Sequence, residues 1–394
     1  MPKVYLVGGS AVEATGQGGM TDSVRVGLVL AAFFGASAVN TAFLPLWFAD
    51  RGLSAPEIGL VLGLASVLRV VGVPAGGWLA DQAGRRAVLV GAGALAAASA
   101  MVMTGFHAVP GLLVLTVVLG VSASLLSPVM DAVTLALSRA GRLQYGPTRA
   151  WGSIAYMLAT ATAGALLART GSVVVPVLLA LGYGAAALFA LHVPDVPTPR
   201  LAGNAEGPFR SAAFRLALGA TVLIQGSHGA YYAFATLHWR AAGIGDMVVG
   251  LLIAEGIVAE VALFLWGRRL VERLGPAGLT ACAAASCILR WTVTAFTTEV
   301  AVLATVQLLH AATFAFQHLS TMLVLSRLGP QRAGMAQAVM SALGFSFATG
   351  IVVWAVGQAY GTLHGLVFLP MALMGGAALL LVPSLRRATE DSRR

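Results

Sequence analysis

Nine ionisable side chains of this 394-residue sequence lie inside long apolar stretches. Such groups cost several kcal/mol there unless they pair or are hydrated, so each is a candidate for binding anions or exchanging protons. They are three acids, three arginines and three histidines: Asp131, Glu255, Glu260, Arg69, Arg149, Arg290, His228, His310 and His318. Because the acids and the arginines are equal in number, they could all form ion pairs with one another. Their positions along the chain therefore decide which of them are candidates for binding a substrate or a proton.

Asp131 and Arg149 flank an expected turn at 141–146, and a helical hairpin would bring them to similar depth. Such a buried pair can also simply fix the register of the hairpin. Arg69 has no acid on its own expected helix, so its partner must come from another helix or from a substrate. A guanidinium holds a carboxylate through two parallel hydrogen bonds, so Arg69 suits an organic anion. A pair with Asp131 or with backbone carbonyls is the alternative.

Glu260, Arg290 and His310 fall in three consecutive expected helices. Burial favours the protonated form of a carboxyl and a nearby arginine favours the ionised form, so Glu260 is suited to load and release a proton. A structural Glu260–Arg290 ion pair is the alternative. Glu255 precedes Glu260 by five residues, roughly 140° around a helix, so it faces another direction.

His228, Tyr231 and Tyr232 form a polar and aromatic face of one helical turn. Aromatic rings with a hydrogen-bonding tip suit an aromatic or ring-shaped ligand. Ordinary helix packing is the alternative, and for Tyr232 it is the favoured one.

The composition excludes a soluble domain. Hydrophobic residues make up 58% of the chain and charged residues 10%, against about 45–50% and about 25% in soluble domains. Disorder is excluded as well, because it requires low hydrophobicity. The net charge of +9 does not indicate nucleic-acid binding, since the basic residues are scattered between apolar runs.

Twelve apolar runs are long enough to span a bilayer as helices, which need about 20 residues each. They cover 24–49, 57–80, 87–106, 110–138, 149–168, 172–192, 213–240, 247–270, 277–297, 300–326, 333–359 and 364–383. The sequence therefore predicts an all-α polytopic membrane protein with twelve transmembrane helices in two six-helix halves. We expect a disordered extension (1–23), an N-terminal half (24–192), a linker (193–212), a C-terminal half (213–383) and a tail (384–394).

The basic residues predict the orientation of the chain. Every loop on the side of the termini carries at least two arginines, whereas the opposite loops carry only Arg51, Arg169 and Arg240. Cytoplasmic loops are enriched in Lys and Arg. Both termini are therefore expected in the cytoplasm, with the protein in the inner membrane.

The loop between the second and third runs contains Gly77, Asp81, Gly84, Arg85 and Arg86 in the order G-x-x-x-D-x-x-G-R-R. It resembles the signature loop of the major facilitator superfamily, although a glutamine follows the aspartate where a basic residue is usual. The segment around Glu272 and Gly275 repeats its acid-x-x-Gly spacing. Parallel repeats of this kind are typical of that fold. The resemblance implies that the loop is a conformational latch, in which Asp81 pairs with arginines and holds the outward-facing state closed on the inside.

Further stretches resemble the phenylpropionate permease family and its relative, the lactose permease. They cover 130–132, 145–155, 225–234, 258–261, 290–291 and 307–318. By this resemblance Asp131 and Arg149 are the substrate-binding pair of the central cavity. The other substrate-binding candidates are Arg69, Trp151, His228 and Tyr231.

The resemblance also implies proton coupling in the second half, through Glu260, Arg290, His310 and His318. Here the chain departs from the lactose permease, because no acid follows His310 by one helical turn. The proton is therefore expected on Glu260, assisted by His310.

The expected function is secondary active transport by alternating access: proton-coupled symport of a small organic anion such as an aromatic carboxylate. The alternatives are a proton symporter of a neutral sugar or nucleoside, a proton-antiport exporter, and a receptor without transport activity. The sequence contains no P-loop, so nothing in it indicates an ATPase. Cys282 and Cys287 lack the spacing of a metal site. We expect a monomer that is not an enzyme, with a small-molecule substrate, protons and the lipid bilayer as partners, and neither cofactor, metal nor nucleic acid.

Overall fold

The computed structural model describes residues 21–195, 207–328 and 330–391, which form helices and turns without a strand. Most of the predicted extension (1–23) and much of the predicted linker (193–212) lie outside the described residues. The described helices group into twelve spans, as predicted. Ten described stretches are long and apolar enough to cross a bilayer, and one of them, Arg332–Asp391, contains the last two spans.

The N-terminal half consists of six uninterrupted spans. They are α1 (Asp22–Asp50), α2 (Ala55–Ala83), α3 (Arg85–Met103), α4 (Val109–Arg139), α5 (Tyr145–Thr170) and α6 (Val175–Ala190), with a short 3-10 turn, η1 (Ser172–Val174), before α6. The backbone N–H of Ser54 donates to the Glu57 carboxylate at 2.8 Å, which caps the start of α2. Gly84, with φ of +87°, separates α2 from α3 in a conformation that favours glycine.

Three of the six spans in the C-terminal half contain a π-helical turn. The spans are α7 (Ala212–Ala230) with η3 (Tyr231–Ala235) and α8 (Thr236–Ala241); α9 (Asp246–Trp266); α10 (Arg268–Phe296); α11 (Val300–Gln307) with η4 (Ala311–Phe316) and α12 (Gln317–Leu325); α13 (Pro330–Val339) with η5 (Met340–Phe347) and α14 (Ala348–Leu363); and η6 (His364–Phe368) with α15 (Leu369–Asp391). A short 3-10 turn, η2 (Pro208–Arg210), precedes α7. Single π-turns inside helices are frequent at functional sites.

The segment predicted as a cytoplasmic tail, 384–394, is helical as far as Asp391, because α15 continues through it. Leu385 is fully buried against the same apolar cluster as Phe214 and Val324. In addition, the Arg327 guanidinium donates to the Thr389 carbonyl at 2.7 Å. This packing keeps the segment helical beyond Pro383, where the sequence pattern indicated an end.

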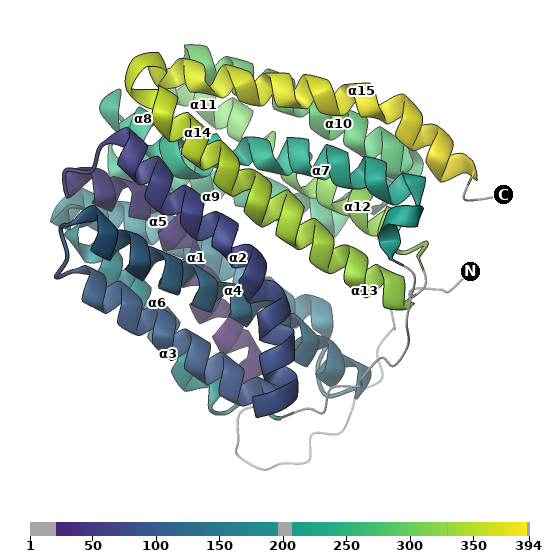
Figure 1. Cartoon of the computed structure of the whole chain (residues 1–394), viewed down its shortest axis with the longest axis horizontal. Helices are drawn as coiled ribbons and strands as arrows, with labels where there is room; N and C mark the ends of the chain where they lie inside the picture. The colour runs from purple at the N-terminus through teal and green to yellow at the C-terminus, as the bar shows by residue number, and fades with distance from the viewer. Residues whose placement is uncertain (1–20, 196–206, 329, 392–394) are drawn as a thin grey trace.

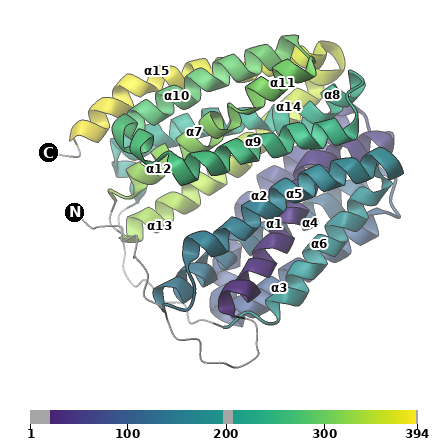
Figure 2. The ribbon, with the colours of Figure 1, turned by 180° about the vertical axis from the view of Figure 1, so that it is seen from behind.

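The two halves lie side by side (Figures 1 and 2), the N-terminal half in purple to teal and the C-terminal half in teal-green to yellow. An even number of spans brings the start of α1 and the end of α15 to one side of the bundle, here called the terminal side. We call the opposite side the far side.

Glycines bring the backbones of the two halves into contact toward the far side. A Cβ on Gly59 of α2 would lie 2.7 Å from the Cα of Gly357 of α14, and one on Gly250 of α9 would lie 2.6 Å from the Thr160 carbonyl of α5. No side chain larger than hydrogen fits at these crossings. The halves are therefore closed against each other on the far side.

An ion pair reinforces this closure. Arg240, at the end of α8, contacts Asp50 at the end of α1 at 2.9 Å and Asp246 of its own half at 3.4 Å. Ser172 donates to the same Asp50 carboxylate from within the N-terminal half. If the halves separated, both Asp50 and Arg240 would keep one polar partner, so the closure is reversible at low cost.

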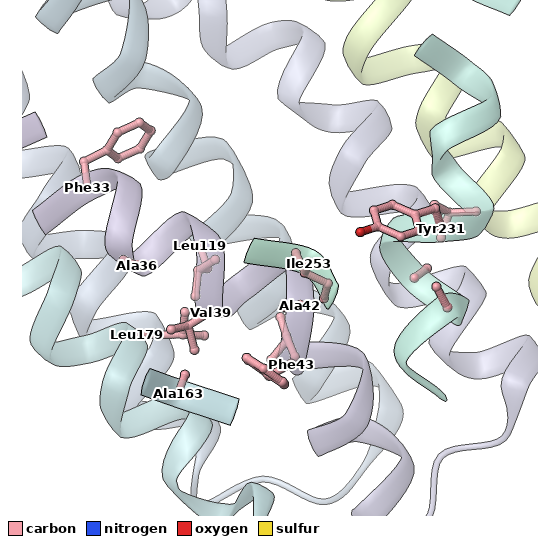
Figure 3. Close-up of a cluster of buried hydrophobic side chains, with 14 of the residues drawn as sticks. Phe33, Ala36, Val39, Ala42, Phe43, Leu119, Ala163, Leu179, Tyr231 and Ile253 are labelled. Carbon is pink, nitrogen blue, oxygen red and sulfur yellow. The ribbon is translucent and has the colours of Figure 1, made fainter. Parts of the chain in front are cut away.

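Apolar packing around α1 holds the N-terminal half together behind these contacts (Figure 3). Val39 and Phe43 of α1 lie in one buried cluster with Ala163 of α5 and Leu179 of α6. Ile253 of α9 joins the same cluster from the C-terminal half. The core thus extends across the closed side of the molecule.

Candidate functional site

A cavity of about 360 Å³ lies between the two halves and is lined by residues of both. Small polar and cationic side chains from α1, α2 and α5 form its N-terminal wall: Asn40, Thr41, Ser66, Arg69, Arg149 and Ser153. The wall from the C-terminal half contains Glu260, His310 and a group of aromatic rings. The cavity thus joins opposite charges from different halves.

The cavity communicates with solvent on the terminal side. Arg149 lines it one turn into α5, and its side chain is 32% exposed. Its neighbour Asp131 is 49% exposed on the same side. Because the far side is closed by the glycine crossings, the structure is a conformation open to the terminal side.

Arg69 is a cation that forms no ion pair with the described residues. It lies midway along α2, lines the cavity and is accessible to solvent. No hydrogen bond or ion pair connects its guanidinium to any residue of the described chain. The alternative expectation, a pair with Asp131 or with backbone carbonyls, is therefore wrong, since Asp131 lies against Arg149 instead.

Arg149 and Asp131 meet across the α4–α5 hairpin as predicted. The Arg149 Nε lies 3.9 Å from the Asp131 carboxylate, and the guanidinium stacks 4.1 Å from the centre of the Phe34 ring. Only Arg149 of the pair lines the cavity. The pair is loose and partly hydrated, so the guanidinium retains donors for a substrate.

Replacing Arg149 by lysine is expected to weaken substrate binding by about 1.5–3 kcal/mol, the range for hydrogen bonds to charged groups. Lysine keeps the charge but loses both the planar fork and the stacking on Phe34. Calorimetric titration of the purified variant measures this loss. Arg142→Lys is the control, because Arg142 pairs with Asp22 outside the cavity at 2.6 Å. Wild-type affinity of Arg149→Lys would show that the residue only fixes the hairpin.

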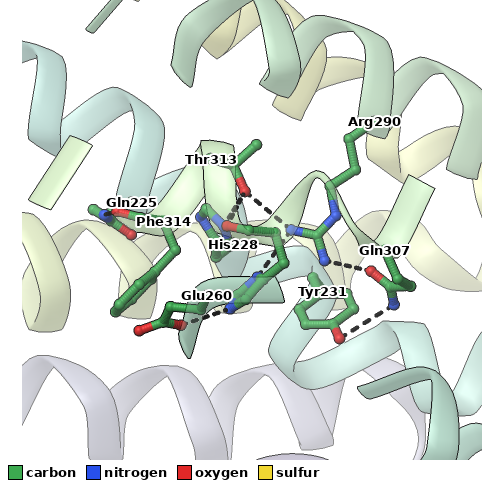
Figure 4. Close-up of polar contacts among 9 residues, drawn as sticks. Gln225, His228, Tyr231, Glu260, Arg290, Gln307, Thr313 and Phe314 are labelled. Carbon is green, nitrogen blue, oxygen red and sulfur yellow. Dashed lines mark hydrogen bonds and ion pairs between the residues drawn. The ribbon is translucent and has the colours of Figure 1, made fainter. Parts of the chain in front are cut away.

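Arg290 is completely buried in the C-terminal half and is held by neutral groups (Figure 4). Its guanidinium donates to Gln307 at 2.5 Å, to Thr313 at 3.1 Å and to His310 at 3.1 Å. It also lies between the rings of Tyr231 and Trp291, at 4.6 and 4.4 Å from their centres. Among the described residues no carboxylate lies within ion-pair distance of Arg290, so the direct Glu260–Arg290 pair is wrong.

His310 lies between Arg290 and Glu260. A guanidinium can only donate, so the Nδ1 of His310 accepts its hydrogen bond, and the proton of the neutral ring resides on Nε2. That Nε2 faces the Glu260 carboxylate at 3.7 Å. The sequence placed these residues on neighbouring helices, but the order Glu260–His310–Arg290 emerges only from the structure.

Glu260 faces the opposite half across the cavity. Its side chain is 18% exposed and lines the cavity together with Arg149 of the N-terminal wall. Glu255 does not line the cavity and has no hydrogen bond or ion pair within the described chain.

Tyr231 lines the cavity as predicted, and its hydroxyl accepts a hydrogen bond from Gln307 at 3.2 Å. His228 does not line it, because its Nε2 accepts from Thr313 at 3.1 Å and Tyr232 covers its ring. Tyr232 itself lines the cavity, contrary to the packing expected for it.

Two further candidates lie apart from the cavity. Trp151 packs against Gly27, where a Cβ would come within 2.8 Å of the indole, and is not part of the cavity lining. The centre of the His318 ring lies 6.4 Å from the centre of the Phe345 ring, and His318 does not line the cavity either. Neither residue touches the Arg290 network in the described chain.

Sequence reasoning missed most of the small polar lining. Ser66 and Ser153 are isolated polar residues in apolar runs, and Asn40 stands beside Thr41 in another such run. Ser66 and Ser153 lie one helical turn from Arg69 and Arg149, a spacing that could have revealed them. Gln307 and Thr313 were also missed as ligands of Arg290, although their polar types in a predicted span were a signal.

The loop predicted as a latch contacts backbone carbonyls in this conformation. Arg85 donates to the Ala132 carbonyl of α4 at 3.3 Å, and Arg86 donates to the Val193 carbonyl at 2.8 Å. Asp81 forms no hydrogen bond or ion pair within the described residues. The latch was expected in the conformation closed on the terminal side, so its role stays a prediction.

A metal site has no support in the described ranges, which contain no group of three His, Cys, Asp or Glu side chains able to hold an ion.

The fold is shared with solved transporter structures. The nucleoside transporter NupG aligns with a TM-score of 0.71 at 15% identity, covering 94% of this chain and 99% of that one. A bacterial homologue of the human lysosomal transporter Spinster, in an inward-facing and unoccupied conformation, aligns with a TM-score of 0.71 at 14% identity, covering 94% and 97%. This chain therefore has the fold of these transporters.

The chain belongs to the MFS_1 like family, whose model matches residues 24–369. It is 29% identical to the probable 3-phenylpropionic acid transporter of Escherichia coli, covering 89% of this chain and 94% of that protein. It is 26% identical to the maltose permease of Geobacillus stearothermophilus, covering 61% and 63%. The protein is therefore a multi-pass membrane transporter and not an enzyme.

Proposed function

We propose that this transporter is a proton-coupled symporter that imports a small organic anion, such as an aromatic carboxylate, across the inner membrane. The observation that carries the proposal is the unpartnered Arg69 in the same cavity as the Glu260–His310 pair. One group offers a site for an anion and the other a site for a proton. Alternating access would expose both sites to each side in turn.

The charge of the cavity supports an anionic substrate. Arg69 and Arg149 line it, and Glu260 is the single carboxylate among its lining residues in the described chain. Protonation of Glu260 leaves the two arginines in excess, so an anion binds best together with a proton. The similarity to a probable 3-phenylpropionic acid transporter supports an aromatic carboxylate as the substrate.

The arrangement around His310 supports Glu260 as the proton carrier. Arg290 occupies the Nδ1 side of the imidazole at 3.1 Å, so a second proton on His310 would point at a buried guanidinium. His310 therefore serves as a fixed donor to whichever anion lies before its Nε2. An ionised Glu260 takes that donor, and a protonated Glu260 frees it for the substrate.

The direction of transport follows from the orientation proposed from the arginine distribution. With both termini in the cytoplasm, the conformation open to the terminal side is inward-facing. A proton gradient directed inward would then drive uptake.

The experiment that tests the anionic substrate compares an acid with its amide. Purified protein at pH 7 is expected to bind 3-phenylpropanoate at least tenfold more tightly than 3-phenylpropanamide, because only the ionised acid forms a bidentate ion pair with Arg69. Isothermal titration calorimetry measures both affinities. Equal affinities would contradict the anion proposal and favour a neutral sugar or nucleoside as the substrate.

A further inference from the structure

The three π-helical turns of the described chain carry the aromatic residues of one cavity wall. Tyr231 and Tyr232 lie in η3, Phe314 in η4 and Phe345 in η5, and all four line the cavity. A π-turn inserts an extra residue and changes the direction of the side chains that follow it. Three separate spans thus use the same device to direct rings at the same space.

The rings are held rigidly from behind. Phe314 stacks on His310 with centres 5.5 Å apart and planes at 17°, and it meets Phe345 edge-on at 6.0 Å. The Gln225 side chain donates to the Phe314 carbonyl at 3.1 Å, which fixes the turn itself. Tyr232 stacks on the buried His228 at 5.8 Å. The wall is therefore a preformed surface.

The opposite wall has a different chemistry. The N-terminal half contributes Arg69 and Arg149 together with Ser66 and Ser153. Two aromatic residues of this half, Phe34 and Tyr156, also line the cavity, and the Arg149 guanidinium lies 4.1 Å from the centre of the Phe34 ring. The cationic donors therefore lie on the side of the cavity opposite the rings of the three π-turns (Figure 4 shows Phe314 beside Glu260, both directed at the N-terminal half).

We propose that Tyr232, Phe314 and Phe345 form a subsite for the ring of an arylalkanoate, while its carboxylate lies against Arg69 in the other half. This inference rests on the proposed anion transport and adds the orientation of the substrate and the residues that select its ring. One molecule then bridges both halves through two different interactions. Closure around it requires both its ring and its carboxylate.

The test compares two acids that differ only in aromaticity, 3-phenylpropanoate and 3-cyclohexylpropanoate, by calorimetric titration of the purified protein. Phe345→Leu and Phe314→Leu are each expected to weaken binding of the phenyl acid roughly threefold to tenfold, the size of one aromatic pair. Binding of the cyclohexyl acid should change less than twofold, since leucine keeps an apolar surface. Arg69→Gln should weaken both acids equally.

Phe347→Leu is the matched control for Phe345→Leu, because Phe347 lies in the same π-turn, η5, as Phe345. The Phe347 residue is 45% exposed and does not line the cavity. This variant should leave both affinities unchanged, which also controls for damage to the turn. If the Phe314 and Phe345 variants weaken both acids equally, or neither, the ring subsite is overturned while anion binding stands. If wild-type protein binds neither acid, the proposed function itself fails.

Discussion

Replacing Glu260 by glutamine is expected to abolish net uptake driven by a proton gradient while leaving substrate exchange intact. Glutamine resembles the protonated carboxyl and keeps a hydrogen-bonding group before His310 Nε2, which Glu260 faces at 3.7 Å. It cannot release a proton, so the empty carrier cannot return. In liposomes, counterflow of labelled substrate should survive and net uptake in excess of protein-free vesicles should vanish.

Glu255→Gln is the matched control for this experiment. Glu255 lies on the same helix, α9, but does not line the cavity and has no polar partner in the described chain. It should retain both activities. Intact net uptake by Glu260→Gln would move the proton to another group, with Asp131 and His310 as the next candidates.

Replacing Arg69 by glutamine is expected to weaken binding of an organic anion by roughly 10- to 100-fold, because a charged hydrogen bond is worth about 1.5–3 kcal/mol. Arg69 has no partner in the described chain, so its removal should not leave a buried carboxylate uncompensated. The melting temperature should therefore change little while the affinity falls.

Arg69→Lys separates charge from geometry, since it should recover part of the affinity but not the bidentate contact. Arg169→Gln serves as the control, because Arg169 is exposed at the end of α5 outside the cavity. Calorimetric titration of all three variants with 3-phenylpropanoate measures the losses. An unchanged affinity of Arg69→Gln would assign the anion to Arg149 alone.

Much of the fold could be predicted from the sequence because a bilayer leaves few alternatives. Backbone groups in hydrocarbon must pair within their own helix, so twelve apolar runs became twelve spans. The Asp131–Arg149 pair was predictable as well, since a short turn fixes the depth of both residues. Local sequence patterns are sufficient to predict a contact between two residues when both lie on one helical hairpin.

The arrangement of the site was harder to predict because it depends on contacts between helices. Spacing placed Glu260, Arg290 and His310 on neighbouring spans but could not show that His310 separates the other two. The π-turns were equally hidden, since no residue type marks them, and they turn Tyr232 toward the cavity. Trp151 faces Gly27 for a similar reason: the rotation of α5 is set by its packing on α1.

Proton-coupled symport requires that a proton and an organic anion bind together, and proton linkage tests this most directly. Titrating wild-type protein with 3-phenylpropanoate near neutral pH, in buffers of different ionisation enthalpy, measures the protons taken up per anion bound. We expect proton uptake approaching one per anion in wild-type protein and none in Glu260→Gln. If the wild-type protein binds the anion without proton uptake at every pH between 6 and 8, proton-coupled symport is contradicted.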